Sequence, residues 1–80
     1  MNKTELEKML QKDNVSPSLY SLNGELLPDR MVIYQSYNNW HVFYFDEKGN
    51  RRNEVVLNSE SEACKYLYEC FKQQYKKIKH

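Results

Sequence analysis

The chain has few of the residues that interrupt regular structure or cross-link small domains. Its 80 residues include two glycines, two prolines and two cysteines. So few breakers argue against disorder, and a chain this short has no room for a second core, so we expect one domain over residues 1–80. An excess of charge is also missing, because the formal net charge is +1. That balance argues against a strongly basic nucleic-acid binder and against an acidic disordered tail.

Long apolar runs are missing too, and no stretch approaches the length that crosses a bilayer. Residues 1–7 form no apolar signal-peptide core, so we expect a cytoplasmic protein with no membrane association. Cys64 and Cys70 lie six residues apart on a predicted helix, which separates their Cα atoms by about 9 Å. A disulfide needs less than about 7 Å, so we expect two free thiols, as in a reducing compartment.

Catalytic and metal-binding patterns are also lacking. His41 and His80 are the only histidines, and no Cys or His spacing resembles a zinc site. A cysteine nucleophile needs a nearby base, and Cys64 falls on the apolar stripe of its predicted helix, where packing is the usual role. Asp46 and Glu47 fall in a predicted turn and are interpreted as solvated turn charges. We therefore expect neither an enzyme nor a bound metal or cofactor.

What the chain does have is clear signals for the starts of two helices. Thr4 opens a capping-box spacing that predicts a helix over residues 4–13, and Ser59 opens a second that predicts one over residues 59–77. The second helix carries one apolar stripe at helical spacing. Its members are Cys64, Leu67, Phe71, Tyr75 and Ile78.

Between the helices, alternating apolar residues and turn signals predict strands. The predicted strands are a short one over residues 19–22 and longer ones over residues 30–36, 40–45 and 51–57. Asn23-Gly24 and a loop over residues 46–50 supply turns. The expected fold is α+β: a small antiparallel β-meander of three to four strands, with an N-terminal and a C-terminal helix packed on one face.

The central strand, residues 40–45, carries rings on both of its faces. Two small helices can cover one face, so the other face either presents aromatic side chains to a partner or is covered by residues 19–27. The first alternative would mark an interface, because exposed apolar patches often do. The sequence leaves both alternatives open.

One set of motifs resembles the small three-stranded DNA-binding domains at the N-terminus of phage-type integrases. Those domains share a Trp-led strand, an Asp…Gly turn followed by basic residues, and a helix that opens with Glu-Ala. The matching residues here are Trp40, Asp46, Gly49, Arg51, Arg52, Glu62 and Ala63. The resemblance implies a DNA-binding module. The acidic start of the last helix and the single cation in residues 30–36 argue against phosphate contacts.

A second resemblance covers more of the chain, roughly residues 19–67. Residues 20–24 (Tyr-Ser-Leu-Asn-Gly), residues 40–49 (a Trp-led aromatic strand ending in an acidic-Lys-Gly turn) and residues 58–67 (with Glu-Ala-Cys) are similar to a family of small bacterial immunity proteins. These proteins are encoded beside polymorphic, contact-dependent toxins. Lys48 stands where the family outline has arginine. The resemblance implies a non-catalytic inhibitor that binds and neutralises a partner toxin.

The function expected from the sequence is therefore an immunity-type protein that binds a toxin domain, with an integrase-like DNA-binding module as the alternative. We expect the contacts to come from exposed residues of the sheet and its hairpin, and Tyr, Trp and Arg are frequent interface anchors. Core packing is the competing interpretation for Trp40 and Tyr44. The predicted partner-binding residues are Tyr34, Tyr37, Trp40, Tyr44, Asp46, Glu47 and Arg52.

Overall fold

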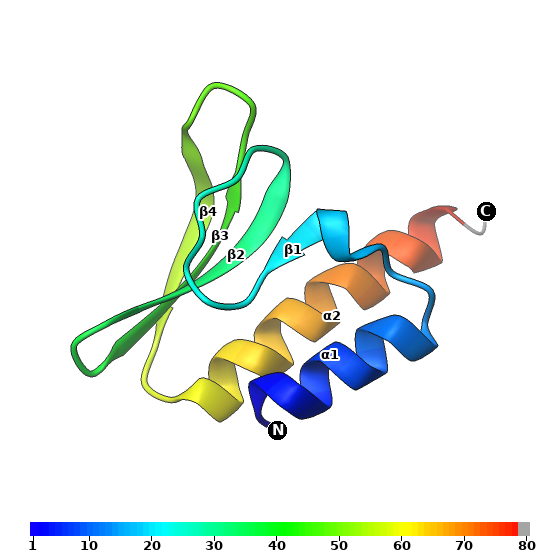
Figure 1. Ribbon diagram of the computed structural model, residues 1–80, viewed down its shortest axis with the longest axis horizontal. Helices are drawn as coiled ribbons and strands as arrows, with labels where there is room; N and C mark the ends of the chain where they lie inside the picture. The colour runs from blue at the N-terminus through cyan, green and yellow to red at the C-terminus, as the bar shows by residue number, and fades with distance from the viewer. Residues whose placement is uncertain (79–80) are drawn as a thin grey trace.

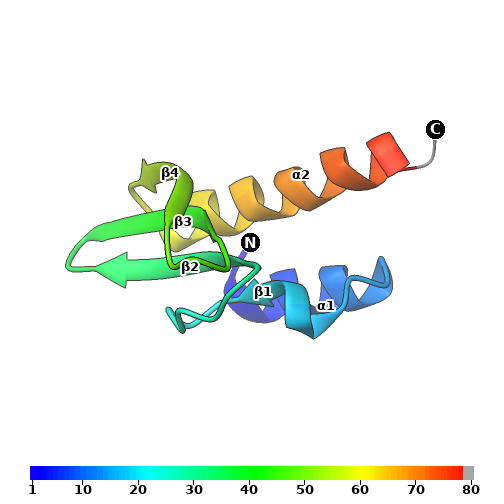
Figure 2. The same cartoon turned by 90° about the horizontal axis from the view of Figure 1, so that it is seen from above.

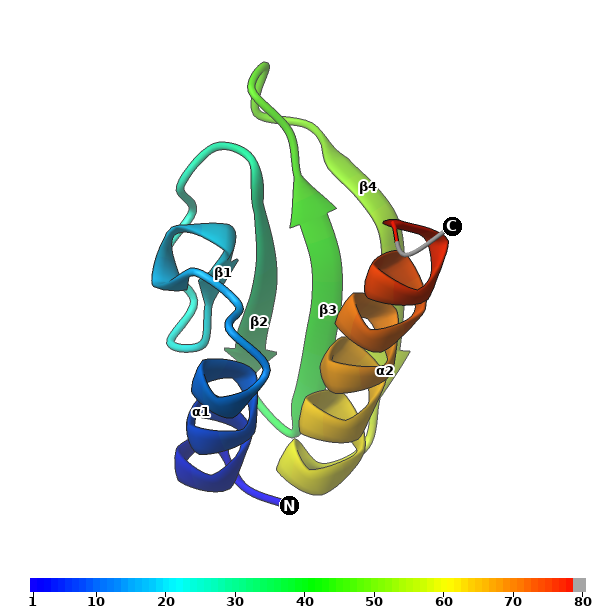
Figure 3. The ribbon, with the colours of Figure 1, turned by 90° about the vertical axis from the view of Figure 1, so that its right-hand side faces the viewer.

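A computed structural model describes the backbone of residues 1–78 and the side chains of residues 1–73. Its elements follow in the order α1 (Lys3–Lys12), η1 (Pro17–Leu19), β1 (Tyr20–Ser21), β2 (Arg30–Ser36), β3 (Asn39–Phe45), β4 (Arg51–Leu57) and α2 (Glu60–Ile78). Figures 2 and 3 show α1 beside the β1–β2 half of the sheet and α2 beside the β3–β4 half. The predicted α+β fold, with both helices on one face, is confirmed.

The strands lie in the order β1-β2-β3-β4. The antiparallel pairs β2–β3 and β3–β4 form the predicted meander. β1 departs from it, because it pairs with β2 in parallel, with Tyr20 opposite Met31. Parallel pairs normally need a crossover of a dozen or more residues. Here residues 22–29 suffice, because β1 spans only two residues and the loop has little length to retrace.

The observed N-cap of α2 is the predicted one, whereas that of α1 is not. Asn2, not Thr4, caps α1: its Oδ1 accepts a 2.8 Å hydrogen bond from the backbone N–H of Glu5. The predicted Thr4 cap is wrong, since Asn is a somewhat better cap than Thr and stands two residues earlier, which lengthens the helix by about half a turn. At α2, Ser59 Oγ accepts from the Glu62 N–H at 3.2 Å, which confirms the second cap.

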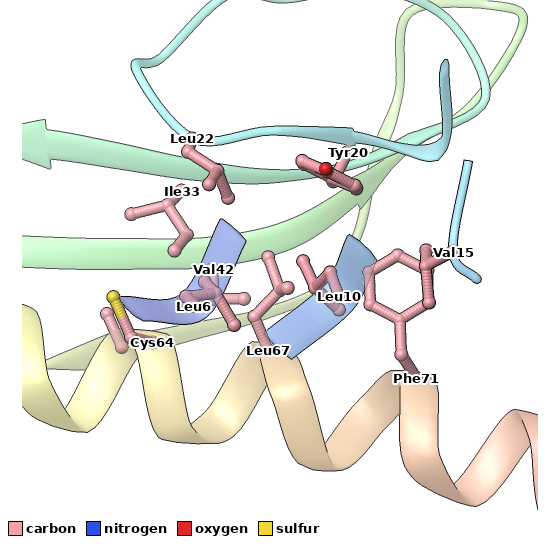
Figure 4. Packing of buried hydrophobic residues seen from close by; sticks show 11 residues of the cluster. Leu6, Leu10, Val15, Tyr20, Leu22, Ile33, Val42, Cys64, Leu67 and Phe71 are labelled. Atoms are coloured by element: carbon pink, nitrogen blue, oxygen red, sulfur yellow. The ribbon is translucent and has the colours of Figure 1, made fainter. Parts of the chain in front are cut away.

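The core lies between the helices and the sheet (Figure 4). Leu6 and Leu10 of α1 meet Leu67 and Phe71 of α2 over Ile33 and Val42 of the sheet. The predicted stripe is confirmed through Phe71, whereas the side chains of Tyr75 and Ile78 lie outside the described residues. Cys64 and Cys70 are free thiols, as expected, and burial raises the pKa of both.

Cross-strand pairs define the two faces of the sheet. Ile33 and Val42 are partners within the core, so their face, which we call the helix face, also carries the next pair with the same parity, Met31 and Tyr44. The alternate pairs, Val32–Phe43 and Tyr34–His41, point the other way, onto what we call the outer face.

The outer face is partly covered, so the alternative in which residues 19–27 cover it holds in part. Val32 and Phe43 are 0% exposed, although the helices lie on the opposite side. The loop of residues 22–29 approaches this face at Tyr34: a Cβ on Gly24 would lie 3.3 Å from its Cδ2 atom. Further along the sheet, Val56 stays 54% exposed. Half of the face is therefore packed, and the half toward β4 is open.

Candidate functional site

The seven residues predicted to bind a partner do not form one patch. Tyr37 lies in the β2–β3 turn, whereas Asp46 and Glu47 lie in the β3–β4 hairpin loop. These turns sit at opposite ends of β3, which spans seven residues. At about 3.4 Å per residue the two ends are on the order of 20 Å apart. Each end therefore has to be considered by itself.

Tyr37 combines two unusual properties. Its side chain is 95% exposed, and its backbone has a φ of 55°. Ser36 and Asn39 are cross-strand partners, so Tyr37 is the first central residue of a two-residue turn. Hairpins usually place Gly, Asn or Asp where φ is positive. A bulky residue in the left-handed region costs about 1–2 kcal/mol, and full exposure of the ring provides no packing to offset that cost.

Trp40 belongs to the edge of the core. It lies on the helix face, is half-buried and packs against the core cluster. Lys3 Nζ lies 5.3 Å from the centre of its ring and donates a 3.3 Å hydrogen bond to Asn23 Oδ1. This geometry favours the packing interpretation for Trp40, with a cation over the exposed part of its ring.

Tyr34 belongs to an aromatic and ionic cluster on the outer face. Its ring lies 6.3 Å from that of His41 and 5.4 Å from the Arg51 guanidinium, which also covers Phe43 at 4.7 Å. Glu54 Oε2 joins the cluster, 2.8 Å from His41 Nδ1 and 3.3 Å from Arg51 Nη1. The cluster presents amphipathic side chains rather than a bare apolar surface.

Asp46 holds the hairpin loop together. Its Oδ1 accepts from the backbone N–H groups of Asn50 at 2.7 Å and Lys48 at 3.0 Å, and its Oδ2 accepts from Arg52 Nε at 2.8 Å. The Asn50 N–H and then the Arg52 side chain lower the pKa of Asp46. Only 7% of the residue is exposed, so its interpretation as a solvated turn charge is wrong. Neighbouring Glu47 is exposed.

A β-bulge in β4 decides which of two adjacent arginines lies on the helix face. The register shifts between Val42 and Tyr44, where Asn53 has a φ of 56°. Arg52 therefore faces Tyr44 on the helix face, while Arg51 lies over Phe43 on the outer face. Arg51 was not among the predicted partner-binding residues, and unbroken alternation from Val55 would have placed it on the helix face. The asparagine, which tolerates positive φ, is the signal that could have indicated the bulge.

The β3–β4 hairpin and α2 diverge from each other (Figure 1). Residues of both elements and of β2 line a groove between them. It has a volume of about 570 Å³ and brings two predicted residues, Tyr44 and Arg52, together with residues that sequence reasoning did not select. Tyr44 donates a 3.0 Å hydrogen bond to Asp29 Oδ1, which raises the pKa of Tyr44. The lining residues are Met31, Tyr44, Arg52, Asn53, Tyr66, Cys70 and Gln73.

The remaining chemistry of the described part of the chain is sparse. Among residues 1–78, no three His, Cys, Asp or Glu side chains gather where they could hold a metal ion. In the same part, no helix is both long and apolar enough to span a bilayer. Among the described residues, the arrangement offers exposed surfaces, a strained tyrosine and a groove. Comparison with protein-family models, with curated proteins and with solved structures found no match to this chain.

Proposed function

We propose that this protein is a non-catalytic, immunity-type binding protein that neutralises a partner toxin domain by covering part of its surface. The observation that carries the proposal is Tyr37, a fully exposed aromatic residue in a backbone conformation that suits glycine. Strain of this kind persists where the surrounding structure over-determines it, and it concentrates at sites of function. The cost to folding has a rationale if the ring is an anchor for a partner.

The surroundings of Tyr37 support this role. Its sequence neighbours Gln35, Asn38 and Asn39 are exposed, so the residues next to the ring along the chain are neutral and polar. Interface anchors are typically aromatic and sit inside a ring of polar residues that exclude water. A two-residue turn also fixes the base of the side chain, which limits the entropy lost on binding.

The DNA-binding alternative receives less support from the geometry. Arg51 and Arg52 are adjacent in β4 and therefore point to opposite faces of the sheet, so they do not form one basic surface. Each also contacts a carboxylate, Glu54 or Asp46. A phosphate backbone binds through several cations on one side of a protein. We expect duplex DNA to bind no more tightly than the non-specific range, about 10⁻⁴–10⁻⁶ M at physiological salt.

The test is a binding measurement with the toxin domain encoded by the neighbouring gene. Isothermal titration of the wild-type protein should give tight binding, and Tyr37→Gly should weaken it at least about 30-fold, the effect of losing an anchor. Asn38→Gly is the matched control, because it changes the same turn without removing a ring. It should leave the affinity within about threefold of wild type.

Two results would contradict the proposal. One is failure of co-expression to protect cells from the neighbouring toxin while the protein accumulates in folded form. The other is sequence-dependent, sub-micromolar binding of duplex DNA that is lost in the Arg51→Ala and Arg52→Ala variants, which would favour the integrase-like alternative. Equal affinities of wild type and Tyr37→Gly for the toxin would remove Tyr37 from the interface and with it the observation that carries the proposal.

A further inference from the structure

β4 forms one edge of the sheet, and its outer side is free. The strand spans Arg51–Leu57 and pairs with β3 on its inner side. In an antiparallel pair, every second residue directs its backbone N–H and C=O groups away from the neighbouring strand. Among the residues that the structure describes, these outward groups of β4 have no hydrogen-bond partner. A row of unpaired backbone groups is a template for a further strand.

The two halves of this edge are protected to different degrees. Proteins block unwanted pairing at an edge with charged residues, bulges or very short strands. β1, at the other edge, spans two residues, and the first half of β4 has two arginines and the bulge at Asn53. Residues 55–57, which we call the open edge, keep a regular register with β3 and carry apolar side chains, of which Val56 is 54% exposed.

The open edge lies at the same end of the sheet as Tyr37. Leu57 pairs with Trp40, close to the start of β3. Tyr37 lies in the turn that precedes β3, and Figure 1 shows this turn and the end of β4 at one end of the sheet. Since neighbouring strands are about 4.8 Å apart, the turn and the open edge are separated by on the order of 10 Å. A partner that encloses the ring of Tyr37 therefore reaches the open edge as well.

We propose that an extended segment of the partner toxin domain pairs with the open edge as a fifth strand of the sheet, while Tyr37 anchors the same partner. The unpaired N–H and C=O groups select this occupant, because they repeat at the spacing of a strand and are matched by another extended backbone. The proposal rests on the function proposed above and specifies how the partner is held.

The side chains of the open edge define the residues that the segment should carry. Val56 lies on the outer face, since it pairs with His41, and Val55 and Leu57 lie on the helix face. Directly opposite residues contact each other across a strand pair, so the segment should be uncharged and apolar at three consecutive positions. A second copy of this chain would satisfy the same edge, but it would leave the strain at Tyr37 without a rationale. One partner accounts for both features.

Amide hydrogen exchange, followed residue by residue by NMR, tests the pairing. The protein is measured alone and saturated with the toxin domain encoded by the neighbouring gene. In the free protein, the outward amides of residues 54–57 should exchange fast and the alternate ones, which bond to β3, slowly. In the complex, the outward amides should exchange at least about 10-fold more slowly, because each gains a hydrogen bond. Protection that instead grows with the concentration of the protein alone would assign the edge to a second copy and overturn the proposal.

Two lysine substitutions supply a matched pair of variants. Val56→Lys places a charge on the open edge, which blocks strand pairing, and should weaken toxin binding at least about 10-fold. Leu26→Lys adds the same charge in the loop of residues 22–29, at a residue that is 44% exposed, and should keep the affinity within about threefold of wild type. Both replaced side chains are exposed, so the fold should be retained. Equal losses in the two variants would overturn the proposal.

The exchange measurement separates this inference from the proposed function. Tight toxin binding that depends on Tyr37 but leaves the exchange of residues 54–57 unchanged would overturn the strand pairing and leave the function intact. A folded wild-type protein that binds no toxin would overturn both.

Discussion

The two hairpin turns of the sheet differ in how well their residues suit their conformations. In the β3–β4 loop, positive φ falls on Gly49 and a buried carboxylate, Asp46, binds the backbone of the loop. In the β2–β3 turn, positive φ falls on Tyr37. There, within the described residues, the turn is held by a side chain through a long 3.5 Å hydrogen bond from Gln35 Nε2 to the Tyr37 carbonyl.

The contrast separates residues that serve folding from residues that need another explanation. In the β3–β4 loop, Gly49 and Asp46 both lower the free energy of the folded state. Tyr37 raises it, by about 1–2 kcal/mol if its left-handed backbone carries the usual penalty. A turn that is optimised for folding reveals little about function, whereas a turn that is not optimised indicates where a partner binds.

The largest change should come from Gly49→Val. A β-branched residue at a φ of +83° is strained, whatever space surrounds it, and a Cβ there meets Phe45 Cζ at an ordinary 3.8 Å. The loss should therefore be conformational, about 1–3 kcal/mol of unfolding free energy. Urea denaturation with an unchanged m-value measures it. Gly49→Asn should lose much less, and equal losses in the two variants would show that the glycine is needed for space.

A smaller effect, which depends on pH, should come from Asp46→Asn. The pKa of Asp46 is lower in the folded protein, so its stabilising contribution is fully present above the unfolded value of about 4 and is lost as the pH falls through the folded value. The variant should melt at a lower temperature than wild type at pH 7, and the gap should shrink below pH 4. Glu47→Gln changes the exposed neighbour of Asp46 and should melt at the same temperature as wild type at either pH.

Much of the fold could be predicted from local signals. The bounds of β2 and β4 match the predicted residues 30–36 and 51–57, because alternation and flanking turns define both ends. The parallel pairing of β1 could not be predicted, since two residues carry no information on direction. The bulge at Asn53 was missed because a single inserted residue breaks a period-two pattern only locally.

The candidate site was less predictable than the fold. Residue type alone selected Asp46 and Tyr37 together, although one is buried by its own loop and the other is fully exposed. What separates them is the path of the backbone: Asp46 faces the N–H groups of its hairpin, whereas Tyr37 faces solvent. The groove depends on how α2 and the hairpin diverge (Figure 1), and a pattern of residue types along the chain carries no information on that angle.

The smallest expected effect is also the most direct test of the comparison. Tyr37→Gly removes the penalty of about 1–2 kcal/mol for a left-handed bulky residue. The same change also lowers the stability by about 0.4–1 kcal/mol, because glycine makes the unfolded chain more flexible. The side chain is 95% exposed, so no packing is lost. The net result should be a gain in stability of roughly 0.5–1 kcal/mol, measured by urea denaturation.

Asn38→Gly is the control for this gain. Asn38 is the second central residue of the turn, and its φ is not positive, so glycine there relieves no strain and increases only the flexibility of the unfolded chain. It should be less stable than wild type by up to about 1 kcal/mol. If Tyr37→Gly is instead the less stable of the two variants, the tyrosine stabilises its own turn. The two hairpins would then be alike, and Tyr37 would no longer indicate where a partner binds.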